Sequence, residues 1–153
     1  NSDSNRDVFN LRLLACLLFS SAAWKTKPRD AFIGWDASTR ARRLHYLTNN
    51  TRFLILPWVR VPHLASHILG RLARRLVCDW QIKYGHPVYA VETFVERDRF
   101  RGTCYRAANW ILLGQTQGRT RYDHSHTLQQ PIKDIYLYPL VPDFREKLCH
   151  ADT

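Results

Sequence analysis

Two side chains in the sequence have the chemistry of an acid–base pair. Glu92 lies among apolar residues in the segment VYAVETFV, which is predicted to be a strand. A carboxylate in that setting has a raised pKa unless a cation pairs with it, and it can then act as a general base. The alternative, which we favour, is a structural ion pair with one of the many arginines.

Tyr105 shares a predicted helix face with Asn109 and Leu112. It could donate a proton to a leaving group, or it could fill the core with its hydroxyl paired.

Arginines dominate the charge of the chain, whose formal net charge is +10. Eight of them, and no acidic residue, lie between Asp36 and Asp79. The guanidinium group matches phosphate oxygens better than the lysine ammonium does, so this block indicates a polyanion-binding surface. The alternative is a solvated basic face that keeps the protein soluble. The arginines expected to contact nucleic acid are Arg71, Arg74, Arg75, Arg101, Arg106, Arg119 and Arg121.

Histidines and cysteines offer a weaker metal hypothesis. His63 and His67 are four residues apart, DHSH occupies 123–126, and His150 follows Cys149. These residue types can bind zinc, but the spacing matches no established zinc pattern, so we expect no metal. The four cysteines form no CxxC pair, which favours reduced thiols and a cytoplasmic protein. P-loop, dinucleotide-binding, GxSxG and HExxH motifs do not occur in the sequence.

The length of 153 residues suits one domain with a proper core. The chain contains no methionine, from which we expect the C-terminal part of a longer protein. The apolar run Leu11–Ala23 is too short to span a bilayer, so we expect no membrane contact. The predicted organisation is a partial N-terminal strand and loop (1–30), a main domain (31–140) and a C-terminal tail (141–153).

Periodicity predicts an α/β fold with a mixed sheet and helices on both faces. A TNNT hairpin turn is expected between two of the strands, and Pro57 should interrupt the pairing of the second. We therefore expect the sheet to open between Arg52–Val61 and Val88–Val95. Strands are predicted at Leu13–Ala23, Leu44–Leu47, Arg52–Val61, Val88–Val95, near Thr116 and at Ile132–Leu140. Helices are predicted at Ala37–Arg43, from Pro62 until Gly85 and Pro87 end the helix, and from Thr103 to Leu113, with a loop at Lys25–Asp36 and a peripheral helix after Val141.

The stretch TCYRAANWILLGQTQGRTR contains two glycines and two closely spaced arginines. Gly114 is predicted to end the helix that Thr103 caps. Gln115–Gly118 would then re-enter the sheet, and Arg119 and Arg121 would project beside the opening. The main predicted role of this stretch is therefore structural, and its secondary role is to contact an anion.

Several long segments resemble one known family. RFLILPWVRVPHLASHILG, ETFV, RFRGTCYRAANW, GQTQGRTR and YLYPL are similar to the DruA family of the Druantia anti-phage system, over roughly Asp30 to Leu140. Members of that family also occur as domains of transposase-like proteins. The resemblance implies a bacterial defence or mobile-element protein that acts on DNA or RNA together with other defence-system or transposon proteins. The family has a glycine where this chain has Thr120.

The element order also resembles the acetyltransferase fold of the GNAT superfamily. In that fold a strand bulges, a helix follows, and the next strand splays away to open a cofactor cleft. The resemblance implies an alternative function, an acyltransferase with Glu92 as base, Tyr105 as acid and acyl-CoA or another acyl donor. The glycine-rich loop that holds pyrophosphate in such enzymes is replaced by RVPHLAS, so we expect no cofactor. A third hypothesis is an inactive scaffold of this fold that docks partner proteins.

Overall fold

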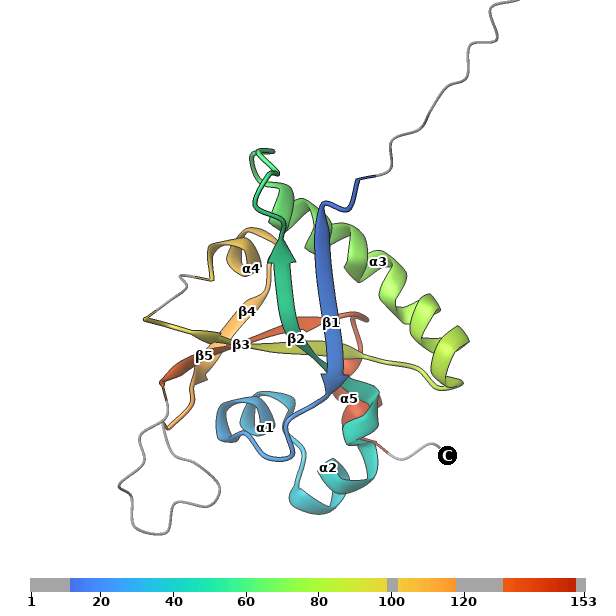
Figure 1. Cartoon of the computed structure of the whole chain (residues 1–153). Helices are drawn as coiled ribbons and strands as arrows, with labels where there is room; N and C mark the ends of the chain where they lie inside the picture. Colours follow the sequence, from blue (N-terminus) through green and yellow to red (C-terminus); the bar gives the residue numbers. More distant parts are fainter. Residues whose placement is uncertain (1–11, 99–101, 118–130, 151–153) are drawn as a thin grey trace, which may run out of the picture.

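The computed structural model describes residues 12–98, 102–117 and 131–150. These form the predicted mixed α/β fold, with a five-stranded sheet in the order β1-β2-β3-β5-β4 (Figure 1). The β2–β3 pair is parallel and the other three pairs are antiparallel. The strands are β1 (Ala15–Ser21), β2 (Leu47–Ile55), β3 (Ala90–Glu96), β4 (Ile111–Gln115) and β5 (Lys133–Pro139). The helices are α1 (Lys27–Ile33), α2 (Ala37–Arg43), α3 (Leu64–Tyr84), α4 (Thr103–Ala107) and α5 (Phe144–Cys149), with a 3-10 turn at Leu44–Tyr46.

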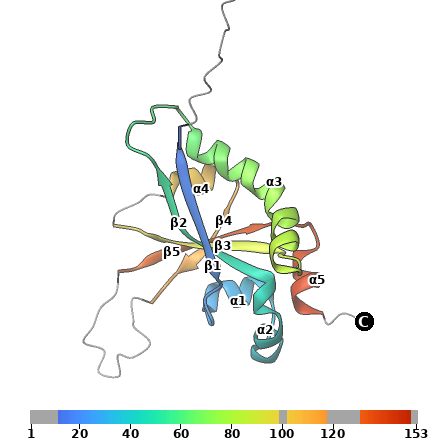
Figure 2. The same ribbon diagram turned by 45° about the vertical axis from the view of Figure 1, so that its right-hand side comes forward.

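Helices cover both faces of the sheet, as the sequence predicts. Alternate side chains of a strand point to opposite faces, so neighbouring residues of β3 enter different cores. Ala90 packs with Ile33 of α1 and Leu148 of α5. Val91 packs with Leu69 of α3 and with Tyr105 of α4. Figure 2 shows α3 and α4 on one side of the sheet, away from α1, α2 and α5.

The predicted opening of the sheet is confirmed, although it begins earlier than Pro57. Among the described residues, β2 pairs with β3 only at Leu47, Thr48 and Asn49. The pairing of β2 with β1 shifts register directly after this point, between Leu18 and Phe19. Such a bulge bends the strand and increases its twist, which turns β2 away from β3. β2 then ends at Ile55, before Pro57.

The predicted hairpin at TNNT is wrong, because these residues lie inside the single strand β2. The side chains of Thr48, Asn49 and Asn50 are buried and hydrogen-bonded, and of these four residues only Thr51 is exposed. Thr48 Oγ1 donates to Ser20 O at 2.9 Å, and Asn50 Nδ2 donates to Leu18 O at 3.0 Å. The asparagines therefore satisfy backbone carbonyls next to the bulge, a use that local turn preference does not reveal.

Three further local predictions are wrong. The strand predicted at Leu44–Leu47 is a 3-10 turn over Leu44–Tyr46. The predicted loop Lys25–Asp36 contains the helix α1, with Pro28 in its first turn and Gly34 (φ 86°) at its end. The helix predicted from Thr103 to Leu113 ends at Ala107, and its N-cap is Gly102 rather than Thr103.

Gly114 consequently does not end a helix. It lies within β4, at a register shift against β5. A Cβ added at Gly114 would meet Pro28 of α1 at 3.1 Å, so the glycine permits close packing of α1 on the sheet.

The longest predicted helix is confirmed as α3. Its C-cap is Gly85, whose φ of 73° ends the helix in the left-handed conformation. The helix predicted after Val141 is present as α5, but it is not peripheral. Phe144 and Leu148 of α5 belong to the same buried cluster as Ala22 and Ala90, so residues from all three predicted ranges share one core. None of the helices in the described ranges is both long enough and apolar enough to cross a bilayer.

Candidate functional site

Glu92 lies in a buried ionic cluster. Its side chain is inaccessible to solvent, and both carboxylate oxygens accept hydrogen bonds. Oε2 accepts from Arg29 Nη1 at 2.9 Å, while Oε1 accepts from the N–H of Ala23 at 2.8 Å and from Asn49 Nδ2 at 3.3 Å. Arg29 is equally buried and also donates to the carbonyl of Ala23 at 2.6 Å. The prediction that Glu92 is buried beside a cation is confirmed, and this geometry favours the structural interpretation.

Asp30 extends the cluster toward the surface. Its carboxylate accepts from Arg29 Nε at 3.0 Å, from the indole N–H of Trp35 at 2.9 Å and from Arg40 Nη1 at 3.2 Å. Burial by itself would raise the pKa of Asp30. The net effect is a lowered pKa, because Asp30 accepts hydrogen bonds from Trp35, Arg29 and the N–H of Thr26 and lies beside the positive charge of Arg29. The cluster therefore joins α1 and α2 to β3 as a set of alternating charges.

Tyr105 is buried on the other face of the sheet. Its hydroxyl donates to Asn50 Oδ1 at 2.8 Å, where β2 leaves β3. Burial raises the pKa of Tyr105 to about 12, so the phenol stays protonated at neutral pH. Its ring packs against Trp110 and Tyr136, with centroids 4.9 and 5.9 Å away. These contacts match the core interpretation of this tyrosine.

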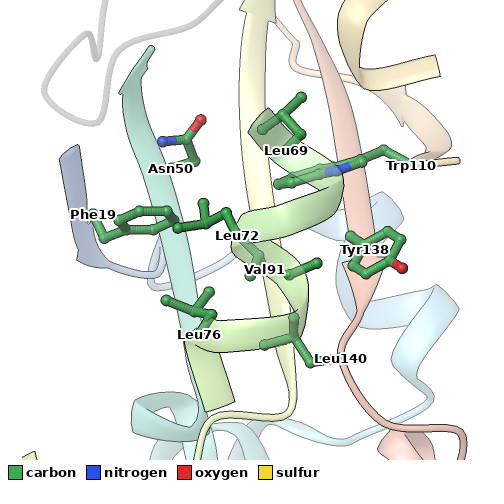
Figure 3. A pocket seen from close by; sticks show the side chains of 10 residues that line it. Phe19, Asn50, Leu69, Leu72, Leu76, Val91, Trp110, Tyr138 and Leu140 are labelled. Carbon is green, nitrogen blue, oxygen red and sulfur yellow. The ribbon is translucent and has the colours of Figure 1, made fainter. Parts of the chain in front are cut away.

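The structure does not bring Glu92 and Tyr105 together. Glu92 contacts α1, whereas Tyr105 packs in the cluster that contains α3 and Val91. Figure 3 shows the side chains that converge beneath α3, among them Asn50, Leu72, Val91 and Tyr138. They leave a cavity of about 10 Å³, which has room for about one water molecule.

The described arginines of the predicted nucleic-acid surface lie on one side of the sheet. Arg71, Arg74 and Arg75 are exposed along α3, as predicted from their positions off its apolar stripe. Arg75 faces Asp79 at 3.4 Å in an exposed i,i+4 pair. Arg106 is exposed on α4, and its Nε donates to the hydroxyl of Tyr136 at 3.0 Å. Arg101, Arg119 and Arg121 lie outside the described residues.

Two arginines of the predicted basic block are structural. Arg40 is buried and pairs with Asp30, and its guanidinium lies 5.5 Å from the ring centroid of Trp24. Arg43 is buried and donates from Nε to the carbonyl of Lys147 at 3.1 Å, which ties α2 to α5. A charge count along the sequence cannot distinguish these from the exposed arginines of α3.

Sequence reasoning missed a second feature, which we call the aromatic groove. It is a depression of about 660 Å³ between the end of β1, the turn after α2 and the C-terminal end of α3. Within the sequence, only the close spacing of Trp80, Tyr84 and His86 hinted at this groove. The other walls of the groove come from segments that are distant in the sequence. The groove is lined by Phe19, Ser20, Ser21, Ala22, Trp24, Ala41, Leu44, His45, Leu47, Trp80, Tyr84 and His86.

The described residues contain no group of three histidine, cysteine or acidic side chains placed to hold a metal ion. His124 and His126 lie outside the described residues. All four cysteines are free thiols.

The structure defines the chain as an α/β protein with a mixed sheet. One face of the sheet holds a buried ionic cluster, and the other is covered by an arginine-bearing helix. Residues 6–133 match the family model of the Druantia protein DruA, so the chain belongs to the DruA family. The match spans every element from β1 to the first residue of β5. Membership associates the chain with anti-phage defence and with the other proteins of such a system. The search of curated proteins found no match.

Proposed function

We propose that this DruA-family chain binds nucleic acid, and that the outer face of α3 is its phosphate-contacting surface. The observation that carries the proposal is the row of Arg71, Arg74 and Arg75 on the solvent side of one helix. With a rise of about 1.5 Å per residue, these side chains span about 6 Å of the helix axis. Phosphate contacts by arginine need no base-specific geometry, so binding depends little on sequence.

The charge around this row supports the proposal. Within the described ranges, Arg71 and Arg74 face no carboxylate at ion-pair distance, and the pair formed by Arg75 is exposed and therefore weak. Arg106 lies on the same side of the sheet and adds a fourth cation. Arg101, Arg119 and Arg121 lie outside the described residues, and their contact with nucleic acid stays a prediction from the sequence. The proteins that act with this chain are other members of the defence system or proteins of a transposon.

The acyltransferase hypothesis keeps one supporting observation, the bulged strand β2 followed by α3 and a splayed β3. The contacts of the two proposed catalytic residues weigh against it. Glu92 has both oxygens engaged, and Tyr105 lies on the opposite face. The cavity beneath α3 is also far smaller than the 300 Å³ or more that is typical of small-molecule sites, and the aromatic groove of about 660 Å³ is lined by neither Glu92 nor Tyr105. We therefore place nucleic-acid binding first.

The test is fluorescence anisotropy with labelled single-stranded and double-stranded DNA at several salt concentrations. Replacing Arg71, Arg74 and Arg75 with glutamine should weaken binding to every sequence. It should also flatten the slope of log K against log salt by about 3 for duplex DNA, because each lost phosphate contact removes about 0.9.

A matched variant controls for net charge. Lys27→Gln, Arg42→Gln and Lys147→Gln remove three exposed positive charges from α1, α2 and α5, on the other side of the sheet. This variant should keep most of the affinity and the salt slope. Equal losses in both variants would show only a nonspecific charge effect. No binding by the wild-type chain at low salt would refute the proposed function.

A further inference from the structure

The aromatic groove exposes flat ring faces that a folded domain normally buries. Trp24 is 54% exposed and Tyr84 is 50% exposed. The ring centroids of Trp80 and Tyr84 lie 4.5 Å apart and the ring planes are tilted by 47°, so the two side chains form an angled aromatic wall at the end of α3. Aromatic side chains present large apolar faces, and their exposure at one depression marks a binding surface.

The electrostatics of the groove favour an anionic ligand. None of the residues that line it is acidic. Lys83 Nζ lies 5.4 Å from the ring centroid of Tyr84, and the guanidinium of Arg40 lies 5.5 Å from that of Trp24. Lys83 therefore adds a positive charge at Tyr84, whereas the charge of Arg40 over Trp24 is offset by its ion pair with Asp30.

Two imidazoles line the same groove. His45 and His86 have ring centroids 5.1 Å apart. Burial lowers the pKa of His45, and the positive charges of His86 and Arg43 lower it further. Burial is the largest cause, and only the two smaller, coulombic causes reflect positive charge near the His45 ring.

The groove also contains an unused hydrogen-bond donor. The indole nitrogen of Trp80 is buried and has no acceptor among the described residues. A buried donor without a partner is uncommon in a native structure. The acceptor atoms at the edge of a nucleobase reach this donor only if the Trp80 ring turns to expose its nitrogen to the groove.

We infer that the aromatic groove binds unpaired nucleotides of a single strand, with a base stacked on Trp24 or on Tyr84. Only unpaired bases expose their faces for stacking, so this site selects single strands over duplex. The inference rests on the proposed function, because it places the bases of the strand whose phosphates α3 contacts. Tyr84 follows Arg75 by nine residues, about 13 Å along the same helix. Nine residues also turn about half way round the helix axis, so a strand that contacts both must pass from the outer face of α3, around the end of the helix, to the groove.

The test compares three labelled DNA probes of equal length: an oligothymidylate, the same strand with abasic sites, and a duplex. The wild-type chain should bind the oligothymidylate about tenfold more tightly than the abasic strand, since stacking of one base contributes about that much. Trp24→Leu with Tyr84→Leu should lower oligothymidylate affinity by about the same factor and leave duplex affinity within about twofold. Trp24→Phe with Tyr84→Phe keeps the ring faces and should restore most of the loss.

Trp58→Leu is the matched control, because Trp58 is 58% exposed but lies outside the groove. It should leave all three affinities unchanged. Equal wild-type affinity for the abasic and normal strands would overturn the inference, even if the leucine variant failed to fold. Salt-dependent binding that needs the α3 arginines but not Trp24 and Tyr84 would also overturn the inference about the groove. In that case the proposed function would stand, and the groove would be better explained as a peptide site. Failure of the wild type to bind any probe would overturn both.

Discussion

Replacing Glu92 with glutamine tests whether the buried ionic cluster is structural. The glutamine amide can still accept from the N–H of Ala23 through its oxygen. Its NH₂ group would then face Arg29 Nη1, at the position where Oε2 now accepts at 2.9 Å. Two donors would oppose each other, and the charge of Arg29 would lose one of its two carboxylates.

The magnitude follows from the partners that remain. Removing one member of a buried ion pair costs about 3–5 kcal/mol. Arg29 retains Asp30 and the carbonyl of Ala23, so we expect the lower end, a loss of about 3 kcal/mol. Arg29→Met should cost more, because it leaves Glu92 without a cation and Asp30 without one of its two. A domain of ordinary stability, about 5–15 kcal/mol, would remain folded in the glutamine variant.

Urea unfolding followed by circular dichroism measures the loss, with Asp98→Asn in the exposed turn after β3 as the control. That control should change stability by no more than about 0.5 kcal/mol. The double variant Glu92→Gln with Arg29→Met should lose less than the sum of the single variants, because the two side chains interact directly. An unchanged unfolding midpoint for Glu92→Gln, together with loss of an acyl-transfer activity, would refute the structural interpretation and restore the general base.

Three further substitutions have defined outcomes. Tyr105→Phe removes the donor to Asn50 Oδ1 and should lower the unfolding free energy by about 1–3 kcal/mol in urea titrations, because a buried acceptor loses its partner. Unchanged stability would contradict a hydrogen bond at this position. Gly102→Ala places a Cβ 2.6 Å from the hydroxyl of Tyr136, at a backbone φ of 65°. We therefore expect the free energy of unfolding to fall by about 2 kcal/mol or more. Wild-type stability in this variant would show that the backbone at Gly102 adjusts easily. The lowered pKa of His45 means that the folded state favours the neutral imidazole ring. The stability that His45 contributes is therefore present above its ordinary pKa of 6.5 and is lost as the pH falls below that value. Thermal melts from pH 7 to about 5 should therefore fall less steeply for His45→Gln than for the wild type, and parallel curves would argue against this role.

Local patterns were sufficient where one element's own residues decide its structure. The apolar stripe of α3 and Gly85 after it predicted a helix and its end, and the strong β-formers of β3 predicted a buried strand. The position of Glu92 among apolar residues likewise predicted burial with a cation. Patterns failed where a distant segment changes the outcome: the asparagines of β2 are satisfied by β1, and Gly114 accommodates Pro28 of α1.

The sequence by itself determined the fold class, the family and the excess of arginine, since these depend on periodicity, motifs and composition alone. Only the tertiary structure decided which arginines are available to a ligand. Arg40 and Arg43 turn inward because Asp30 and a carbonyl of α5 provide acceptors there, whereas Arg71 and Arg74 lie opposite the buried stripe of α3. The aromatic groove likewise exists only after folding, because the end of β1, the turn after α2 and the end of α3 become neighbours through sheet pairing and helix packing that no local spacing encodes.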